Sequence, residues 1–197
     1  MPTAKLSILK EEAKRKTIHI CGAVIPVLYL FVSKEVMLFA FVLALIIVFV
    51  LEWSRLRGIL SLPCIRNKEQ QEIGAYVFFM IGAFLTILFF EKRIAIAAIF
   101  MLAIGDAASA LAGAVMNEAQ PALCERSMKP PAVMLVIFVI SLIIGWLVLH
   151  LLPVAVLGAF GAMLADGVPL RIQTVQLDDN LTIPLFSGVL MSFGSLW

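Results

Sequence analysis

The stretch that decides the fold is IAIAAIFMLAIGDAASALAGAV at residues 94–115. A helix needs about 20 predominantly apolar residues to cross the hydrocarbon core of a bilayer. This stretch has that length, and its one charged side chain is Asp106. It therefore predicts a membrane-spanning helix with a carboxylate inside it.

The composition of the whole chain agrees with a membrane protein. The 197 residues are 62% hydrophobic and 14% charged, whereas soluble domains have about 45–50% apolar and about 25% charged residues. The mean hydropathy is +1.07. A net charge of +2 is too small to favour a nucleic-acid partner. The three cysteines are an odd number and widely spaced, so we expect neither a disulfide framework nor a zinc site.

The other apolar runs predict an all-α, polytopic transmembrane bundle of about seven segments, built as a single domain over 1–197. The run at 153–164 is short for a complete span. Residues 1–17 predict an interfacial arm with a short surface helix, and no signal-peptide cleavage pattern follows it. The segments besides 94–115 are 18–32, 36–51, 75–90, 131–152, 153–164 and 183–196.

The charges divide unequally between the two ends of these segments. Twelve of the fifteen Lys and Arg residues fall on the side of the N-terminus, and the other side has only Lys34, Lys92 and Arg93. Short cytoplasmic loops are enriched in Lys and Arg, so the N-terminus is predicted to be cytoplasmic. Eleven of the thirteen acidic residues lie on the same side. No insertion rule requires this of acids, which indicates a functional site with cationic partners at the cytoplasmic face.

Asp106 is the first candidate for that site. A carboxylate at membrane depth costs several kcal/mol unless it is paired, hydrated or placed in a cavity, so it indicates function. Small residues follow it up to Gly113, and these would let a helix or a ligand approach the backbone. The alternative is a structural role, in which Asp106 makes a polar contact that holds closely packed helices together.

Lys16 and His19 are the second candidates. On a helix they share a face with Glu12, which would place a cation and a titratable donor at the membrane interface. The alternative is a basic anchor with a snorkelling lysine.

The segment ERSMKP at 125–130 is the third candidate. Arg126 and Lys129 with the Ser127 hydroxyl suit a polyphosphate. The prolines that follow predict a helix start, whose free N–H groups favour an anion. The alternative is a loop anchor.

The segment DDNLTIP at 178–184 is the fourth candidate. Asp178, Asp179 and Asn180 offer hard oxygen ligands suited to Mg²⁺ held jointly with phosphates, or an Asp or Asn among them caps the last helix. Both functions are compatible. Glu72, with Glu52, Arg55 and Glu69, completes a ring of inner charges, which individually have the character of solvated loop residues.

The order of these segments resembles the CTP-dependent lipid-alcohol kinases, which include dolichol kinase, phytol kinase and CTP-type diacylglycerol kinase. The family has a basic pair and a histidine before its first span, as in Arg15-Lys16-x-x-His19. Its GDAxAxxxG stretch is similar to residues 105–113, and its DNxxIPxxSG stretch is similar to residues 179–188. The motifs of soluble nucleotide-binding folds and of common hydrolases are absent from the sequence.

The chain departs from the family pattern in two places. Asn117 stands where the family usually has a second glycine. The KSxEG stretch of the family's presumed nucleotide-binding loop is replaced by residues 126–130, with Lys129 at the acidic position and proline at the glycine. These departures bear on the choice of nucleotide.

The resemblance implies phosphoryl transfer from CTP to the hydroxyl of a membrane isoprenoid alcohol, giving a lipid monophosphate and CDP. Asp106 and Asp179 would hold Mg²⁺, with His19 or one of the aspartates taking the hydroxyl proton. Two other functions remain open: cytidylyl transfer to a lipid phosphate, and ion-coupled transport through Asp106. The residues implied in binding nucleotide and balancing its charge are Lys16, Glu72, Gly113, Asn117, Arg126, Ser127, Lys129 and Asn180.

Overall fold

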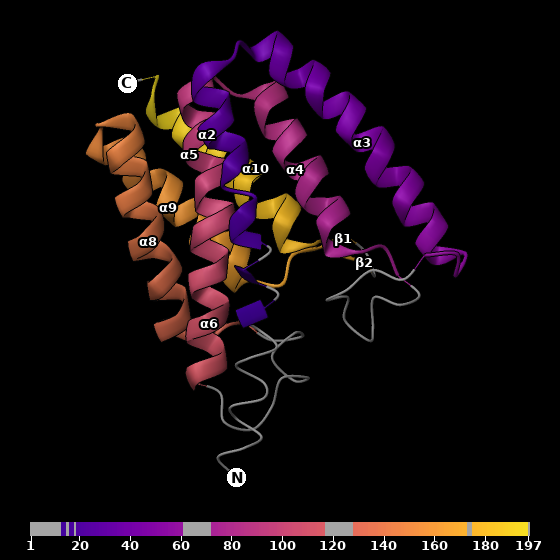
Figure 1. The fold of residues 1–197 in the computed structure, drawn as a ribbon. Helices are drawn as coiled ribbons and strands as arrows, with labels where there is room; N and C mark the ends of the chain where they lie inside the picture. Colours follow the sequence, from indigo (N-terminus) through magenta and orange to yellow (C-terminus); the bar gives the residue numbers. More distant parts are fainter. Residues whose placement is uncertain are drawn as a thin grey trace.

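The computed structural model describes residues 13–14, 16–17, 19–60, 72–116, 128–172 and 175–196, and these form a helical bundle (Figure 1). The predicted all-α class is confirmed. A two-residue antiparallel ladder of β1 (Arg171–Ile172) and β2 (Val175–Gln176) connects the last two helices. The helical elements in chain order are α2 (Val24–Phe31), α3 (Lys34–Leu56), α4 (Ala75–Phe89), α5 (Lys92–Phe100), η2 (Met101–Asp106), α6 (Ala107–Met116), α8 (Pro131–Leu149), α9 (Leu152–Gly167) and α10 (Asp179–Gly194).

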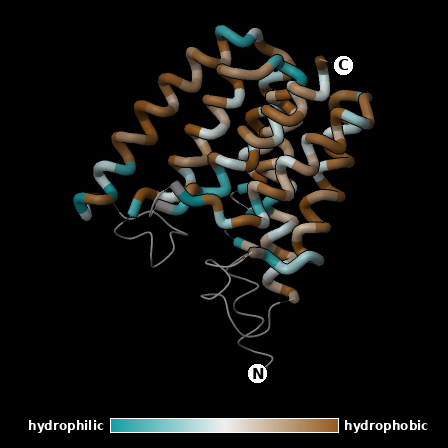
Figure 2. Tube along the Cα trace, turned by 180° about the vertical axis from the view of Figure 1, so that it is seen from behind, coloured by the Kyte–Doolittle hydropathy of each residue, from teal (hydrophilic) through white to brown (hydrophobic). Residues whose placement is uncertain are grey.

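Within the described ranges, three helical stretches are long and apolar enough to cross a membrane: Lys34–Leu56, Lys92–Met116 and Pro131–Leu149. Shorter apolar helices cover His19–Phe31, Ala75–Phe89 and Leu152–Gly167. Figure 2 shows hydrophobic runs along the helices and hydrophilic segments near their ends. The count of seven membrane segments, the interfacial arm and the orientation of the N-terminus remain predictions.

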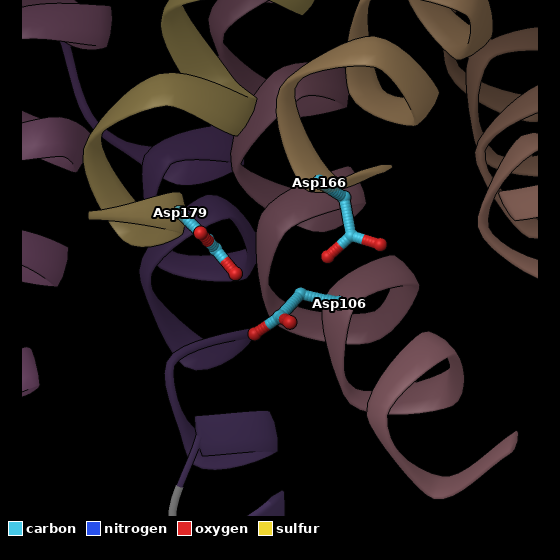
Figure 3. Close-up of side chains that lie close together, drawn as sticks. All are labelled: Asp106, Asp166 and Asp179. Atoms are coloured by element: carbon cyan, nitrogen blue, oxygen red, sulfur yellow. The ribbon is translucent and has the colours of Figure 1, made fainter. Parts of the chain in front are cut away.

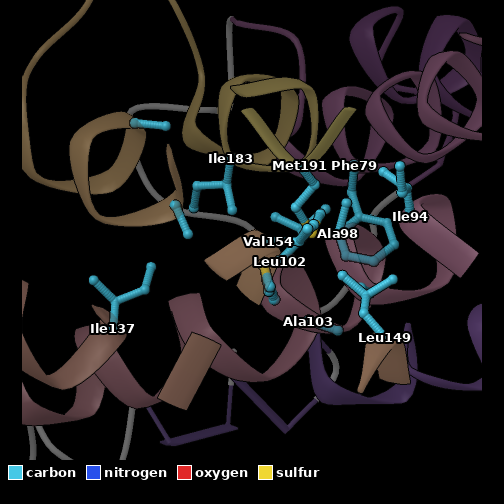
Figure 4. Packing of buried hydrophobic residues seen from close by; sticks show 14 residues of the cluster. Phe79, Ile94, Ala98, Leu102, Ala103, Ile137, Leu149, Val154, Ile183 and Met191 are labelled. Atoms are coloured by element: carbon cyan, nitrogen blue, oxygen red, sulfur yellow. The ribbon is translucent and has the colours of Figure 1, made fainter. Parts of the chain in front are cut away.

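The centre of the bundle is the continuous rod α5–η2–α6. In the most apolar stretch of the rod, 72% of the residues are buried inside the bundle, whereas 17% are buried in the corresponding stretch of α3. Small side chains such as Ala97 and Ala98 are fully buried and let the neighbouring helices approach closely. Figure 4 shows the core that results, a cluster that joins Leu102 with side chains from α4, α8, α9 and α10. This packing fixes the element that carries Asp106.

The rod contains a feature that the sequence did not predict. Residues Met101–Asp106 form a π-helical turn, η2, and Asp106 is its last residue. A Cβ atom on Gly105 would lie 3.0 Å from the Ser141 Oγ of α8, so glycine allows close packing beside Asp106. Single π-turns within α-helices are frequent at functional sites.

Of the helix boundaries that differ from the prediction, two concern aspartates. Helix α9 continues to Gly167, so Asp166 lies in its last turn and not in a loop. Helix α10 begins at Asp179, before the predicted residue 183, because the Asp178 side chain accepts a hydrogen bond from the Asn180 N–H at 3.0 Å and caps the helix. Both shifts bring carboxylates onto ordered helix ends.

Candidate active site

Three aspartates from three helical elements converge beside the middle of the rod, at the end of η2 (Figure 3). Asp106 ends η2, Asp166 lies in the last turn of α9, and Asp179 begins α10. One carboxylate oxygen from each lies within 4.8 Å of the other two. We call Asp106, Asp166 and Asp179 the three-carboxylate site.

Lys16 neutralises Asp106. Its Nζ lies 2.5 Å from Asp106 Oδ2, and Lys16 and Asp106 are 6% and 4% exposed. A lysine buried on a carboxylate does not fit the alternative of a snorkelling anchor. The ion pair does agree with the alternative of a structural polar contact that holds two segments together. Asp106 is therefore compatible with a structural role and a functional role at the same time.

His19 contacts the same carboxylate. Its Nε2 lies 3.1 Å from Asp106 Oδ2 and 3.3 Å from the Leu102 carbonyl oxygen. Both neighbours are acceptors, so Nε2 carries a hydrogen in this arrangement. The ring packs edge-on against Phe79, with the centroids 4.9 Å apart. His19 therefore acts as a donor to Asp106 through Nε2.

Asp166 is held by two donors. Ser109 Oγ donates to its Oδ2 at 2.6 Å, and Lys129 Nζ donates to its Oδ1 at 2.6 Å. Lys129 also lies 3.7 Å from Asp179 Oδ2. Burial lowers the pKa of Lys129, but the carboxylates of Asp166, Asp179 and Asp106 outweigh burial, and the pKa lies above its usual range. Lys129 is therefore a fixed positive charge between two of the aspartates.

Asp179 is the member open to solvent. Its side chain is 43% exposed, against 5% for Asp106 and 0% for Asp166. Partial burial raises the pKa of Asp179, the negative charges of Asp106 and Asp166 act in the same direction, and Lys129 opposes them. A ligand would therefore meet Asp179 first.

Asn180 lies beside Asp179 at the start of α10. Its backbone N–H donates to Asp178 Oδ1 at 3.0 Å, which confirms the capping interpretation with Asp178 as the cap, and its Nδ2 donates to the same oxygen at 2.7 Å. Its Oδ1 is a buried acceptor with no hydrogen-bond donor within the described part of the chain. An orphaned buried oxygen is costly unless a ligand or water satisfies it.

The donor set fits a hard divalent cation. Mg²⁺ binds oxygen at about 2.0–2.1 Å, so two of its direct ligands lie at most about 4.2 Å apart. The separations of up to 4.8 Å are close to that limit, and Mg²⁺ usually keeps several waters. Within the described residues, two lysines face three carboxylates. With neutral His19 the site thus has a net negative charge, which favours a cation.

The remaining predicted residues lie apart from this centre or outside the described residues. Gly113 is in α6, and a Cβ atom there would meet only Val133, at 4.0 Å, so helix packing does not require glycine. Glu72 is exposed, and its carbonyl oxygen accepts a hydrogen bond from Arg55 Nη2 at 2.7 Å. Asn117, Arg126 and Ser127 are outside the described residues.

Sequence reasoning missed Asp166 and Ser109 as site residues. Asp166 was counted only among the inner acidic residues of a loop. The signal was available, because Ala-Asp-Gly at 165–167 follows an apolar run just as Gly-Asp-Ala at 105–107 interrupts one. A carboxylate flanked by small residues at the end of an apolar segment has the same cost of burial in both places.

A second buried polar group lies where α3 ends and α4 begins. Glu52 accepts hydrogen bonds from Arg55 Nε and Nη2 and from Gly74 N–H, each at 2.7 Å, and from the Tyr76 hydroxyl. Glu52 and Arg55 are 4% and 8% exposed, so their prediction as solvated loop charges is wrong. We call these four residues the Glu52 cluster.

Comparison with curated proteins supports the family resemblance. The chain is 26% identical over 149 residues to CTP-dependent diacylglycerol kinase 1 of Eremothecium gossypii (strain ATCC 10895 / CBS 109.51 / FGSC 9923 / NRRL Y-1056). The match covers 64% of this chain and 46% of the relative, so it spans about half the relative's length. No family model matches the chain, and no solved structure matches it significantly. The similarity to CTP-dependent lipid kinases is therefore confirmed, at a distance.

Proposed function

We propose that this protein is a CTP-dependent kinase that phosphorylates the hydroxyl group of a membrane lipid at the cytoplasmic face. One observation carries the proposal: three carboxylates within 4.8 Å of one another and two lysines gather near one end of an apolar bundle. Phosphoryl transfer needs charge neutralisation and in-line positioning more than covalent chemistry by the protein. The diacylglycerol kinase relative supports the same reaction class.

Asp106, Asp166 and Asp179 would hold Mg²⁺, with Asn180 as a further oxygen donor. When bound, the metal would neutralise charge on the β- and γ-phosphates. The carboxylates would then share their negative charge with the metal, leaving Lys16 and Lys129 to attract phosphate oxygens. Gly113 would leave room beside α6 for the nucleotide.

In the transfer step the lipid hydroxyl oxygen bonds to the γ-phosphorus while the bond from that phosphorus to the β–γ bridging oxygen breaks, releasing CDP. The hydroxyl proton must go to a protein group or to water. His19 Nε2 is a donor in this arrangement, which favours a carboxylate as acceptor. We assign this role to Asp179, through the carboxylate oxygen that it would not give to the metal, because it is the most exposed of the three.

The acceptor we propose is a long isoprenoid alcohol of the dolichol or polyprenol type, which the family resemblance implies. Diacylglycerol is the second candidate, and the printed name of the relative favours it. Either lipid would keep its tail in the membrane and present its hydroxyl near Asp179. A lipid acceptor would account for a phosphate-handling site on an apolar bundle.

The test uses the purified full chain in detergent with labelled CTP, Mg²⁺ and a panel of polyprenols, phytol and diacylglycerol. We expect a lipid monophosphate and CDP, and Asp106→Asn should lower the rate by about 100-fold or more, the scale of losing a group that stabilises transition-state charge. The matched control is Asp178→Asn, because asparagine caps a helix as well as aspartate. Unchanged activity in Asp106→Asn would show that the assigned role of Asp106 is wrong.

The products separate the kinase from its nearest rival. A cytidylyltransferase would release pyrophosphate and leave CMP on the lipid phosphate, whereas the kinase releases CDP. If none of the lipids gains a phosphate from CTP, the kinase proposal fails and ion-coupled transport through Asp106 is the function to test next.

A further inference from the structure

The other end of the bundle has a cavity that the proposed reaction does not use. It has a volume of about 320 Å³ and lies among α2, α5 and α8, which pack side by side (Figure 1). Arg93 and His150 supply its polar groups, and its apolar wall includes Leu30, Phe100 and Leu147. The volume is within the range of about 300–1,000 Å³ typical of ligand pockets.

The cavity is amphipathic along the helix axis. Arg93 lies in the first turn of α5, and Phe100 lies seven residues further along the same helix, about 10 Å deeper at 1.5 Å per residue. His150 caps the end of α8, and Leu147 lies one turn before it. A ligand with a charged head and an apolar tail matches this arrangement.

Arg93 differs from the other basic residues at this end. Lys34 Nζ donates to the Phe90 carbonyl, and Lys92 Nζ donates to the carbonyls of Leu30 and Val32. In the described part of the chain, Arg93 has no hydrogen-bond or ion-pair partner. Its guanidinium is thus available to form the paired hydrogen bonds with phosphate that arginine favours.

We propose that this cavity binds an anionic phospholipid from the leaflet at the Arg93 end, with the phosphate between Arg93 and His150 and an acyl chain along Leu147 and Phe100. By the predicted orientation this is the outer leaflet. The site is separate from the proposed kinase site, since it surrounds the α5 part of the rod and none of the three aspartates lines it.

Trp146, exposed one turn before His150, offers a direct measurement. The full chain with Trp53→Phe and Trp197→Phe keeps Trp146 as its one tryptophan and is reconstituted into phosphatidylcholine vesicles. Brominated phosphatidylglycerol or brominated phosphatidylcholine is then added at equal mole fraction. We expect brominated phosphatidylglycerol to quench Trp146 more strongly than brominated phosphatidylcholine, as if its concentration beside Trp146 were about fivefold higher. This is the size of effect that one basic residue has on an anionic lipid.

Two variants test the assignment. Arg93→Gln should abolish the preference, and His150→Asn should reduce it while tolerating the left-handed conformation at this position (φ 57°). The matched control Lys34→Gln removes the same charge at the same end and should keep the preference. Circular dichroism checks that each variant is folded.

Four results would overturn the proposal. The first is equal quenching by the two lipids, and the second is a preference that survives Arg93→Gln. The third is a preference lost equally in Lys34→Gln, which would indicate general charge attraction. Competition by inorganic phosphate as effective as by unbrominated phosphatidylglycerol would also reject a lipid in favour of a free anion.

Discussion

The Glu52 cluster and the three-carboxylate site are both buried and charged, yet they are built differently. Each Glu52 oxygen accepts two hydrogen bonds, which fills the roughly four acceptor positions of a carboxylate. Each Asp166 oxygen accepts one hydrogen bond from the described residues. Three carboxylates there share two lysines.

The difference separates a structural contact from a binding site. A carboxylate whose acceptor positions are all filled and whose charge is paired has no free lone pair for a ligand. Glu52 is of this kind, and its hydrogen bonds connect the end of α3 to the start of α4. A group of carboxylates with spare lone pairs and excess negative charge can accept a metal. Burial alone does not distinguish the two, whereas counting donors against acceptors does.

The largest effect should come from breaking the Glu52 cluster. Glu52→Gln leaves Arg55 buried without its counter-charge, and losing one partner of a buried pair costs about 3–5 kcal/mol. We expect this loss in the free energy of unfolding, measured by denaturation in mixed micelles. The kcat of the remaining folded protein should change little, and a kcat that falls with unchanged stability would place Glu52 in the active site.

Breaking the three-carboxylate site should have the opposite signature. Asp166→Asn should lower lipid phosphorylation by about 10²–10³-fold, or about 2.7–4 kcal/mol in activation free energy, if Asp166 stabilises transition-state charge through the metal. The change in unfolding free energy should be smaller than that of Glu52→Gln. Measuring the rate against Mg²⁺ concentration checks the role, because the variant should require more metal. A normal Mg²⁺ dependence would assign Asp166 a structural role only.

Metal binding should stabilise only the protein with an intact site. A ligand at 100 times its Kd stabilises the folded state by about 2.7 kcal/mol. We expect Mg²⁺ to raise the unfolding free energy of wild type and of Glu52→Gln alike, and to have no effect on Asp106→Asn. Removing Mg²⁺ with a chelator should reverse the gain. Equal stabilisation of Asp106→Asn would place the metal elsewhere.

The smallest effect should come from Ser109, which positions Asp166. Ser109→Ala removes one of the two hydrogen bonds to a buried carboxylate, and a hydrogen bond to a charged group contributes about 1.5–3 kcal/mol. Since Lys129 still holds Asp166, we expect about a tenfold loss of kcat/KM. Ser109→Thr, which keeps a hydroxyl, should retain more activity than Ser109→Ala. Equal loss in both would indicate a packing effect.

The lengths of the apolar runs predicted the fold class. The runs at 75–90, 131–152 and 153–164 have bounds close to those of the observed helices α4, α8 and α9. The convergence of Lys16 and His19 on Asp106 was only partly predictable. Helical spacing placed Lys16 and His19 on one face, but nothing local specified which span that face would meet.

Other features of the site depend on tertiary contacts. Asp166 joins the site because α9 runs three residues past its apolar stretch, to Gly167, and because Ser109 and Lys129, distant in sequence, reach its oxygens. Glu52 accepts two hydrogen bonds from Arg55 on its own helix and two from Gly74 and Tyr76 at the start of α4. Composition could not distinguish Asp166 and Glu52 from solvated charges, because donors to both carboxylates come from other segments.

The π-helical turn at Met101–Asp106 has a consequence for the rotational register of the central rod. Each residue of an α-helix advances the side chain by about 100°, and a wide turn changes the phase between the residues before and after it. Ala97 and Ala98 on α5 can therefore face the core while Asp106 and Ser109 face the aspartates of α9 and α10. Deleting one residue here, such as Ile104, would turn Asp106 by about 100° relative to α5 without changing the site's chemistry.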